Sequence, residues 1–111
     1  MPTATPRELA LDRVFAALAN HERRTMLRQL RRGPVETPVI AASFDFSKQA
    51  LSRHLAVLEE AGLIDRTARG RMHSVSLAPR PLDDVSAWIS ELRRGWQSSL
   101  ERLDRVLQGS S

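Results

Sequence analysis

The first half of the chain alternates apolar and polar positions with the period of helices. Over residues 8–19, apolar side chains recur at i, i+3, i+4 and i+7, which predicts an amphipathic helix. A second helix is predicted over residues 21–32, capped by Asn20 and ended by Gly33-Pro34. Thr37 is then predicted as an N-cap, followed by Pro38 at the first helical position, which opens a short third helix over residues 37–44. The inward positions of the first two helices are Leu11, Val14, Phe15, Leu18, Met26, Leu27 and Leu30.

The stretch SKQALSRHLAVLEEAGLI, residues 47–64, predicts a fourth helix with two contrasting faces. Ser47 can cap its start, and Gly62 can end it because glycine tolerates the left-handed conformation. Three leucines lie within about 60° of one another on a helical wheel, and a polar stripe lies opposite. The leucines are Leu51, Leu55 and Leu58, and the stripe consists of Lys48, Gln49, Ser52, Arg53 and Ala56.

After this helix the pattern changes from helical to alternating. Residues 64–67 and 71–77 predict two strands joined by a turn at 68–70. In the second strand, apolar or aromatic residues alternate with serines, so one face is expected to pack inward. That inward face consists of His73, Val75 and Leu77.

A long final helix is predicted over residues 82–107, with one regular apolar stripe. Residues 1–7 are expected to form a flexible N-terminal arm and 108–111 a flexible tail, so that 8–107 form a single domain. The fold class is therefore mainly α with a small β-hairpin: a winged helix-turn-helix of about five helices plus a two-stranded wing. The stripe contains Val85, Trp88, Ile89, Leu92, Trp96, Leu100, Leu103 and Leu107.

This order of elements favours a DNA-binding interpretation of the polar stripe on the fourth helix. Taken alone, the stripe is most simply a solvated helix face. In a helix-turn-helix, however, the second helix of the pair enters the major groove of DNA and presents its outer side chains to base edges. A wing tip with Arg66, Arg69 and Arg71 beside Gly70 can lie along the neighbouring backbone or in the minor groove. The combination predicts a sequence-specific DNA-binding protein.

Some polar side chains of the fourth helix are expected to contact bases, and others to contact phosphates. Gln49 and Arg53 are one helical turn apart, and these two residue types pair well with adenine and guanine respectively. The other side chains are better suited to phosphates, which fix the register of the protein on the duplex. The predicted DNA-binding residues are Ser47, Lys48, Gln49, Ser52, Arg53, Arg66, Arg69 and Arg71.

Composition supports this interpretation only weakly. The 111 residues carry a net charge of +4, and nearly all of the 17 basic residues are arginine, whose planar fork suits phosphates and guanine. An arginine-for-lysine bias also arises in a GC-rich genome, so both explanations stay open. Neither a secretory signal nor a membrane span is expected, and the expected location is the cytoplasm, with no membrane partner.

Four segments resemble regulators of the ArsR type, a family of winged-helix proteins: FAALANHERR at residues 15–24, SKQALSRHL at 47–55, LEEAGLI at 58–64 and Gly70-Arg71. The resemblance extends over about residues 8–107, and the tail is similar to a metal-independent branch of the family. It implies a homodimeric bacterial transcription factor, usually a repressor, with its recognition helix at 47–61. It also implies that the first and last helices form the dimer interface.

The apolar stripe of the last helix leads to the same expectation of a dimer. A winged-helix monomer of this length has no second layer to cover that stripe, and soluble monomers rarely expose so large an apolar patch. A twofold dimer on DNA should bind an inverted repeat. The predicted interface residues are Leu11, Phe15, Trp88, Ile89, Leu92, Trp96, Leu100 and Leu103.

The chain departs from the family pattern at two positions. His21 stands where many relatives have proline, and Val75 replaces a frequent wing tyrosine, so a contact that depends on that tyrosine is not expected. Both changes concern local geometry.

No metal site and no cofactor are predicted. The chain lacks cysteine, and its three histidines lie in three different elements without the spacing of a ligand pair. We interpret His54 as a partly buried structural histidine bonded to a neighbouring backbone group. The five arginines of the second helix are expected mainly to form salt bridges and coat the surface.

An enzyme is not expected, because no nucleophile and base are suggested by the sequence. Two other functions stay open beside the DNA-binding repressor. One is a winged-helix module for protein interactions that has lost DNA binding, which the polar recognition face argues against. The other is a sensor of the same fold that responds to a metal or an unknown small-molecule effector, with the tryptophans lining a pocket.

Overall fold

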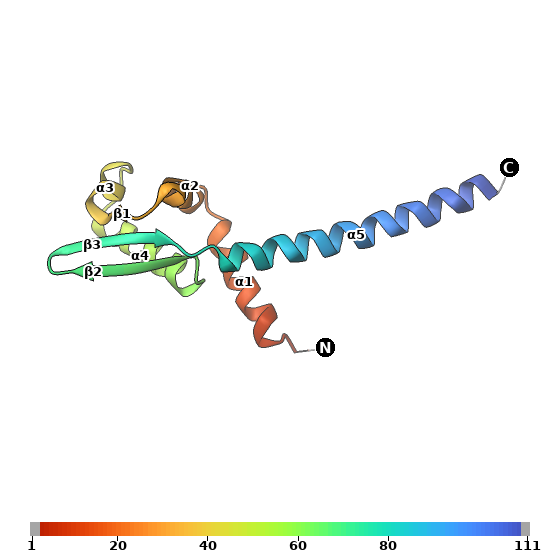
Figure 1. Ribbon diagram of the computed structural model, residues 1–111, viewed down its shortest axis with the longest axis horizontal. Coiled ribbons are helices and arrows are strands. Elements are labelled where there is room, and N and C mark those ends of the chain that lie inside the picture. Colours follow the sequence, from red (N-terminus) through yellow and green to blue (C-terminus); the bar gives the residue numbers. More distant parts are fainter. Residues whose placement is uncertain (1–2, 110–111) are drawn as a thin grey trace.

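The computed structural model describes residues 3–109 and has the predicted fold class (Figure 1). The molecule measures 72 × 30 × 22 Å, and its long dimension comes from the last helix. Its elements in chain order are α1 (Pro6–Leu18), α2 (His21–Gln29), the 3-10 turn η1 (Leu30–Arg32), β1 (Val35–Glu36), α3 (Thr37–Ala42), α4 (Lys48–Glu60), β2 (Ile64–Arg69), β3 (Met72–Leu77) and α5 (Arg80–Gly109).

The first helix begins earlier than the sequence predicts. Thr5 caps α1 through a capping box: its hydroxyl accepts from the amide of Glu8, and the Glu8 carboxylate accepts from the amide of Thr5. Pro6 and Arg7, expected in the arm, are therefore helical, and so are residues 108 and 109 of the expected tail. Residues 1, 2, 110 and 111 of the expected arm and tail lie outside the described residues.

The ends of α4 follow the sequence closely. The Ser47 hydroxyl accepts from the amide of Ala50 at 3.1 Å, which satisfies one of the unpaired amides of the first turn. At the other end, Gly62 has a φ of 74° and donates to the carbonyl of Glu59, while Leu63 donates to that of Leu58. These two bonds form a Schellman motif, which ends the helix and turns the chain into the wing.

The wing belongs to a three-stranded sheet, not to an isolated hairpin. The strand order is β1-β3-β2, with both pairings antiparallel. β1 is only two residues long and pairs Val35 with Val75, so no alternating pattern predicts it from the sequence. β2 extends two residues beyond its expected end and β3 begins one residue later than expected, because Arg69 pairs with Met72 and the turn lies at Gly70-Arg71 instead of 68–70.

The core lies where α1, α2, α4 and the base of the wing meet. The inward leucines of α4 are all buried, and Leu58 is fully inaccessible to solvent. His73 shares its strand face with the buried Val75 but is exposed, contrary to the prediction, because it pairs with Ala68 close to the tip of the hairpin. In α3, Glu36 and not Thr37 occupies the N-cap position, the helix ends at Ala42 and not at residue 44, and Ile40 is the buried residue.

The last helix leaves the compact head as a rod (Figure 1). α5 contains 30 residues, which corresponds to a length of about 45 Å. Val85 is its single buried residue among those described. Trp88, one turn later, still contacts Phe15 of α1, and the rest of the helix projects beyond the other described elements. Its apolar stripe therefore remains at the surface.

Candidate nucleic-acid interface

The polar stripe of α4 is exposed, as the sequence predicts. Lys48, Gln49, Ser52 and Arg53 all have exposed side chains, while the leucines on the opposite face are buried. Ser47 is also exposed, although its hydroxyl already accepts a hydrogen bond as the helix cap. The helix therefore presents one continuous polar face to solvent.

The two sides of this face have different surroundings. Lys48 and Ser52 line a hollow of about 520 Å³ between α3, α4 and the wing, which Arg66 and Arg71 line from the wing. Gln49 and Arg53 lie outside that hollow. Lys48, Arg66 and Arg71 together outweigh the one carboxylate in the lining, that of Glu36, and they favour phosphate because lysine and arginine only donate hydrogen bonds and carry positive charge.

The hollow also contains groups that the sequence does not reveal as part of this surface. Glu36 and Thr37 line it from the start of α3, and His73 lines it from β3. The Thr37 hydroxyl donates to the carbonyl of His73 at 3.2 Å, which ties α3 to the wing. Only the pairing of β1 with β3 brings these residues together, because Thr37 and His73 are 36 positions apart.

The three wing arginines do not form one cluster. Arg66 has the same strand parity as the buried Ile64, so the two share a hairpin face, while Arg69 belongs to the opposite face. Arg71 lies in the turn next to Gly70, whose φ of 61° is typical of the first position of a two-residue hairpin loop. The wing can therefore present charge on both of its sides.

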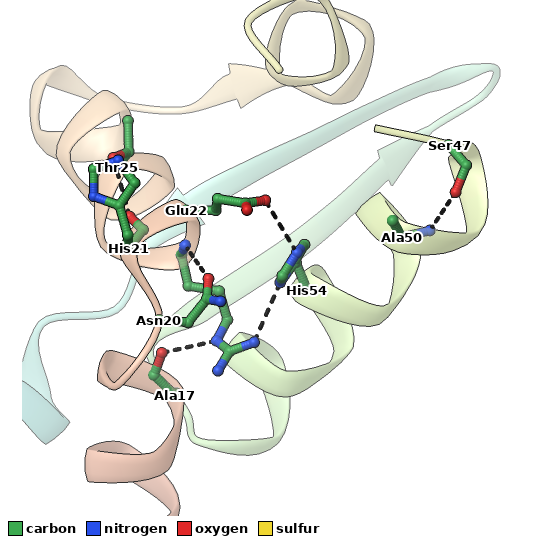
Figure 2. Close-up of polar contacts among 9 residues, drawn as sticks. Ala17, Asn20, His21, Glu22, Thr25, Ser47, Ala50 and His54 are labelled. Carbon is green, nitrogen blue, oxygen red and sulfur yellow. Dashed lines mark hydrogen bonds and ion pairs between the residues drawn. The ribbon is translucent and has the colours of Figure 1, made fainter. Parts of the chain in front are cut away.

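His54 is a partly buried structural residue, but its bonding partners differ from the prediction. Its ring is 17% exposed, with Nε2 3.5 Å from the Glu22 carboxylate and Nδ1 3.2 Å from the Arg23 guanidinium (Figure 2). Its partners are therefore side chains of α2, not a backbone group. The ring also packs on Phe46, with 5.0 Å between ring centroids.

Two arginines of α2 bind carbonyl groups instead of forming salt bridges. Arg23 donates from Nε to the carbonyl of Ala17 at 2.8 Å and from Nη2 to that of Ala16 at 3.1 Å. Arg24 donates to the carbonyl of Leu18 at 2.6 Å. These contacts correct the expectation of a salt-bridged surface for Arg23 and Arg24, while Arg28, Arg31 and Arg32 are exposed.

The predicted interface residues lie on α1 and α5, and the structure joins only some of them. Phe15 and Trp88 meet edge to face, with 5.5 Å between ring centroids, and fix the base of α5 against α1. Trp88 also lines a hollow of about 410 Å³ between α1 and α5, together with Leu11, whereas Trp96 does not. Ile89, Leu92, Trp96, Leu100 and Leu103 are all exposed along the rod.

Comparison with known proteins identifies the family. A family model described as a helix-turn-helix domain matches residues 18–67, which include α2, α3, α4 and the start of the wing. The chain is 32% identical over 79 residues to the transcriptional repressor SdpR of Bacillus subtilis, a match that covers 71% of this chain and 88% of that protein.

A second relative and a solved structure agree with this match. The HTH-type transcriptional regulator Rv2034 of Mycobacterium tuberculosis is 33% identical over 89 residues, which is 80% of each protein. The crystal structure of the ArsR family transcriptional regulator RHA00566 superposes with a TM-score of 0.76 at 32% identity, over 79% of this chain and 97% of that one. The chain belongs to the ArsR family.

Membership of the ArsR family and the named relatives show that the protein is a DNA-binding transcriptional regulator, not an enzyme. In the described part of the chain, no group of three or more His, Asp or Glu side chains is placed to hold a metal ion. Within residues 3–109, no helix combines the length and apolar content needed to cross a bilayer.

Proposed function

We propose that this ArsR-family protein is a cytoplasmic, homodimeric repressor that binds an inverted-repeat operator through α4 and the wing. The observation that carries the proposal is the continuous exposed face of Lys48, Gln49, Ser52 and Arg53, next to a hollow with a basic rim. The name of SdpR, a transcriptional repressor, supports repression.

The uncovered stripe of α5 supports the dimer. Ile89, Trp96 and Leu103 recur every seven residues, and Leu92 falls between the first two, as in the seam of a coiled coil. An apolar seam along a 30-residue helix exceeds what soluble monomers usually expose. A second copy of the chain offers the same seam, so a twofold pairing would cover both at once.

On DNA, each protomer would use the two sides of the α4 face differently. Gln49 and Arg53 lie outside the basic hollow and are free to contact base edges in the major groove. Lys48 and Ser52 share the hollow with Arg66 and Arg71, where a phosphate would bring four partners together. The second protomer would make the same contacts with the other half-site. The centres of the two half-sites would be about one turn of the DNA helix, or a multiple of it, apart.

The experiment compares Arg53→Ala with Arg71→Ala on two duplexes. One duplex is selected by the wild-type protein from a random pool, and the other is its scrambled version, both measured across a salt series. Arg53→Ala should cost on the order of 1–3 kcal/mol on the selected duplex and relax the preference at particular base pairs. Arg71→Ala should weaken both duplexes alike and flatten the salt dependence by about one unit of slope.

Two results would contradict the assignment in different ways. If Arg53→Ala weakens both duplexes equally while Arg71→Ala removes base preference, the roles of the two arginines are reversed. If neither substitution alters binding, α4 and the wing do not form the reading surface.

A further inference from the structure

Arg23 joins three elements of the head through one planar side chain. Its guanidinium donates to two carbonyls in the last turn of α1, those of Ala16 and Ala17, and to Nδ1 of His54 on α4. Its own backbone amide donates to the Asn20 side chain, the cap of α2, at 2.9 Å. The residue therefore connects α1, α2 and α4.

The contacts with α1 satisfy unpaired carbonyl groups at the C-terminal end of that helix. The last carbonyls of a helix lack partners within it and carry partial negative charge, which favours a cation at that end. α1 has no basic residue in its own last turn. Arg23 and Arg24 supply the charge from α2 and bind the carbonyls of Ala16, Ala17 and Leu18.

The contact with His54 is directional. A guanidinium has donors only, so Nδ1 of His54 must accept, and the ring proton resides on Nε2. Nε2 therefore carries its proton on the side of the Glu22 carboxylate, 3.5 Å away, where the negative charge favours it. Phe46 packs on the ring from the turn before α4. The orientation of His54 is thus determined on every side, as Figure 2 shows for its polar partners.

We infer that Arg23 is a positioning residue for DNA recognition, because it holds α4 at a set orientation relative to α1. This inference rests on the proposed function, in which α4 reads the bases and α1 belongs to the dimer interface. His54 lies next to Arg53, so its anchored ring restrains the helix turn that carries the proposed base contact. A lysine at position 23 would keep the charge but lose the planar fork needed to reach three acceptors.

The chain offers a matched control one residue away. Arg24 donates to a carbonyl of the same turn of α1, and among the described residues its side chain forms no hydrogen bond or ion pair with α4. Arg23→Lys and Arg24→Lys are therefore compared on the duplex selected by the wild-type protein, on its scrambled version, and on a selected duplex with one base pair added between the half-sites. Melting curves of both variants set a temperature at which each is fully folded.

Arg23→Lys should lower the ratio of selected to scrambled affinity by about tenfold and reduce the penalty for the added base pair. Arg24→Lys should keep both at wild-type values. Simple destabilisation would not produce this pattern, because a smaller folded fraction weakens binding to every duplex by the same factor.

Two substitutions of His54 provide a second test that does not depend on how well Arg23→Lys folds. His54→Asn keeps an acceptor near the position of Nδ1 but loses the ring, and His54→Phe keeps the ring against Phe46 but loses the acceptor. The inference predicts that His54→Asn retains more of the affinity ratio than His54→Phe. The reverse order would mean that ring packing, not the bond to Arg23, positions the helix.

The outcomes separate this inference from the proposed function. A wild-type protein without preference for the selected over the scrambled duplex overturns both. A clear wild-type preference that Arg23→Lys and Arg24→Lys retain equally overturns the positioning role alone and leaves the reading face of α4 intact.

Discussion

The compact head and the rod of α5 have the same kind of sequence pattern but opposite surroundings. In the head, the apolar residues of α4 pack under other elements, and Leu58 is completely buried. In α5, an equally regular stripe stays exposed, with Trp96 at 67%. Figure 1 shows the reason directly: the head surrounds α4 with neighbouring elements, whereas α5 projects beyond them.

The difference shows that amphipathicity identifies a face that will be covered but not what covers it. Removal of apolar surface from water is favourable whether the surface that covers it belongs to the same chain or to another. For α4 the partner is the rest of the head, and for most of α5 we propose a second copy. Three experiments, from the largest expected effect to none, test this contrast.

The largest effect is expected from Trp96→Glu, which places a carboxylate in the proposed seam of the dimer. A charge buried between two apolar helices has no partner there, so the protein should become monomeric or aggregate. The affinity for an inverted repeat should fall roughly a hundredfold or more. A dimer contacts both half-sites at once, whereas a monomer contacts only one of them. Sedimentation at micromolar concentration and DNA titration measure the two effects.

Ser98→Glu is the matched control for that substitution. It adds the same charge two residues away, at a position outside the apolar stripe of α5. The variant should remain a dimer. A wild-type protein that sediments as a monomer at micromolar concentration would show that something other than a second copy covers α5.

Two leucine substitutions, one in the head and one in the rod, should change different measured quantities. The first should change the free energy of unfolding and the second the dimer dissociation constant. Leu58→Ala opens a cavity in the head and should lower the free energy of unfolding by about 3 kcal/mol, with the dimer dissociation constant nearly unchanged. Leu100→Ala should raise the dissociation constant by about tenfold, because it removes apolar area from the proposed seam twice in each dimer. Denaturant melts and sedimentation equilibrium measure these quantities, and a reversed result would contradict the division into head and rod.

The smallest effect is expected from metal ions. α5 carries no histidine, and the chain has no cysteine, so neither thiolate ligands nor a histidine site on the last helix can form. Stoichiometric zinc, nickel, cadmium or arsenite should leave DNA affinity unchanged. Calorimetry that detects one tight site per protomer, coupled to release from DNA, would show that the histidines of the head bind metal after all.

Much of the fold can be predicted from short-range features of the sequence. Asn20 and Ser47 cap their helices as expected, and Gly62 ends α4 with the expected left-handed turn. Each of these signals acts within one helical turn, because a cap or a glycine satisfies backbone groups only a few residues away. The exposed stripe of α4 follows in the same way from the helical period.

Apart from the start of α1, where the local capping box of Thr5 is missed, the main errors concern contacts between elements that are distant in the sequence. β1 is missed because two residues have no period, and its partner Val75 lies 40 positions later. His73 is wrongly placed in the core because alternation gives the strand face but not how far the hairpin extends beyond the head. The partners of His54 are wrong for the same reason, since the residues of α2 that reach it are some 30 positions away.

The sequence by itself therefore determined the order of the helices, the caps at Asn20 and Ser47, the wing and the polar face of α4, because these depend on period and on local backbone chemistry. Only the tertiary structure decided that Arg23 binds both the end of α1 and His54, and that residues 3–109 leave most of α5 uncovered. Those outcomes depend on the relative orientation of packed elements. That orientation is set by the sum of many weak contacts across the core, and no single stretch of residues encodes it.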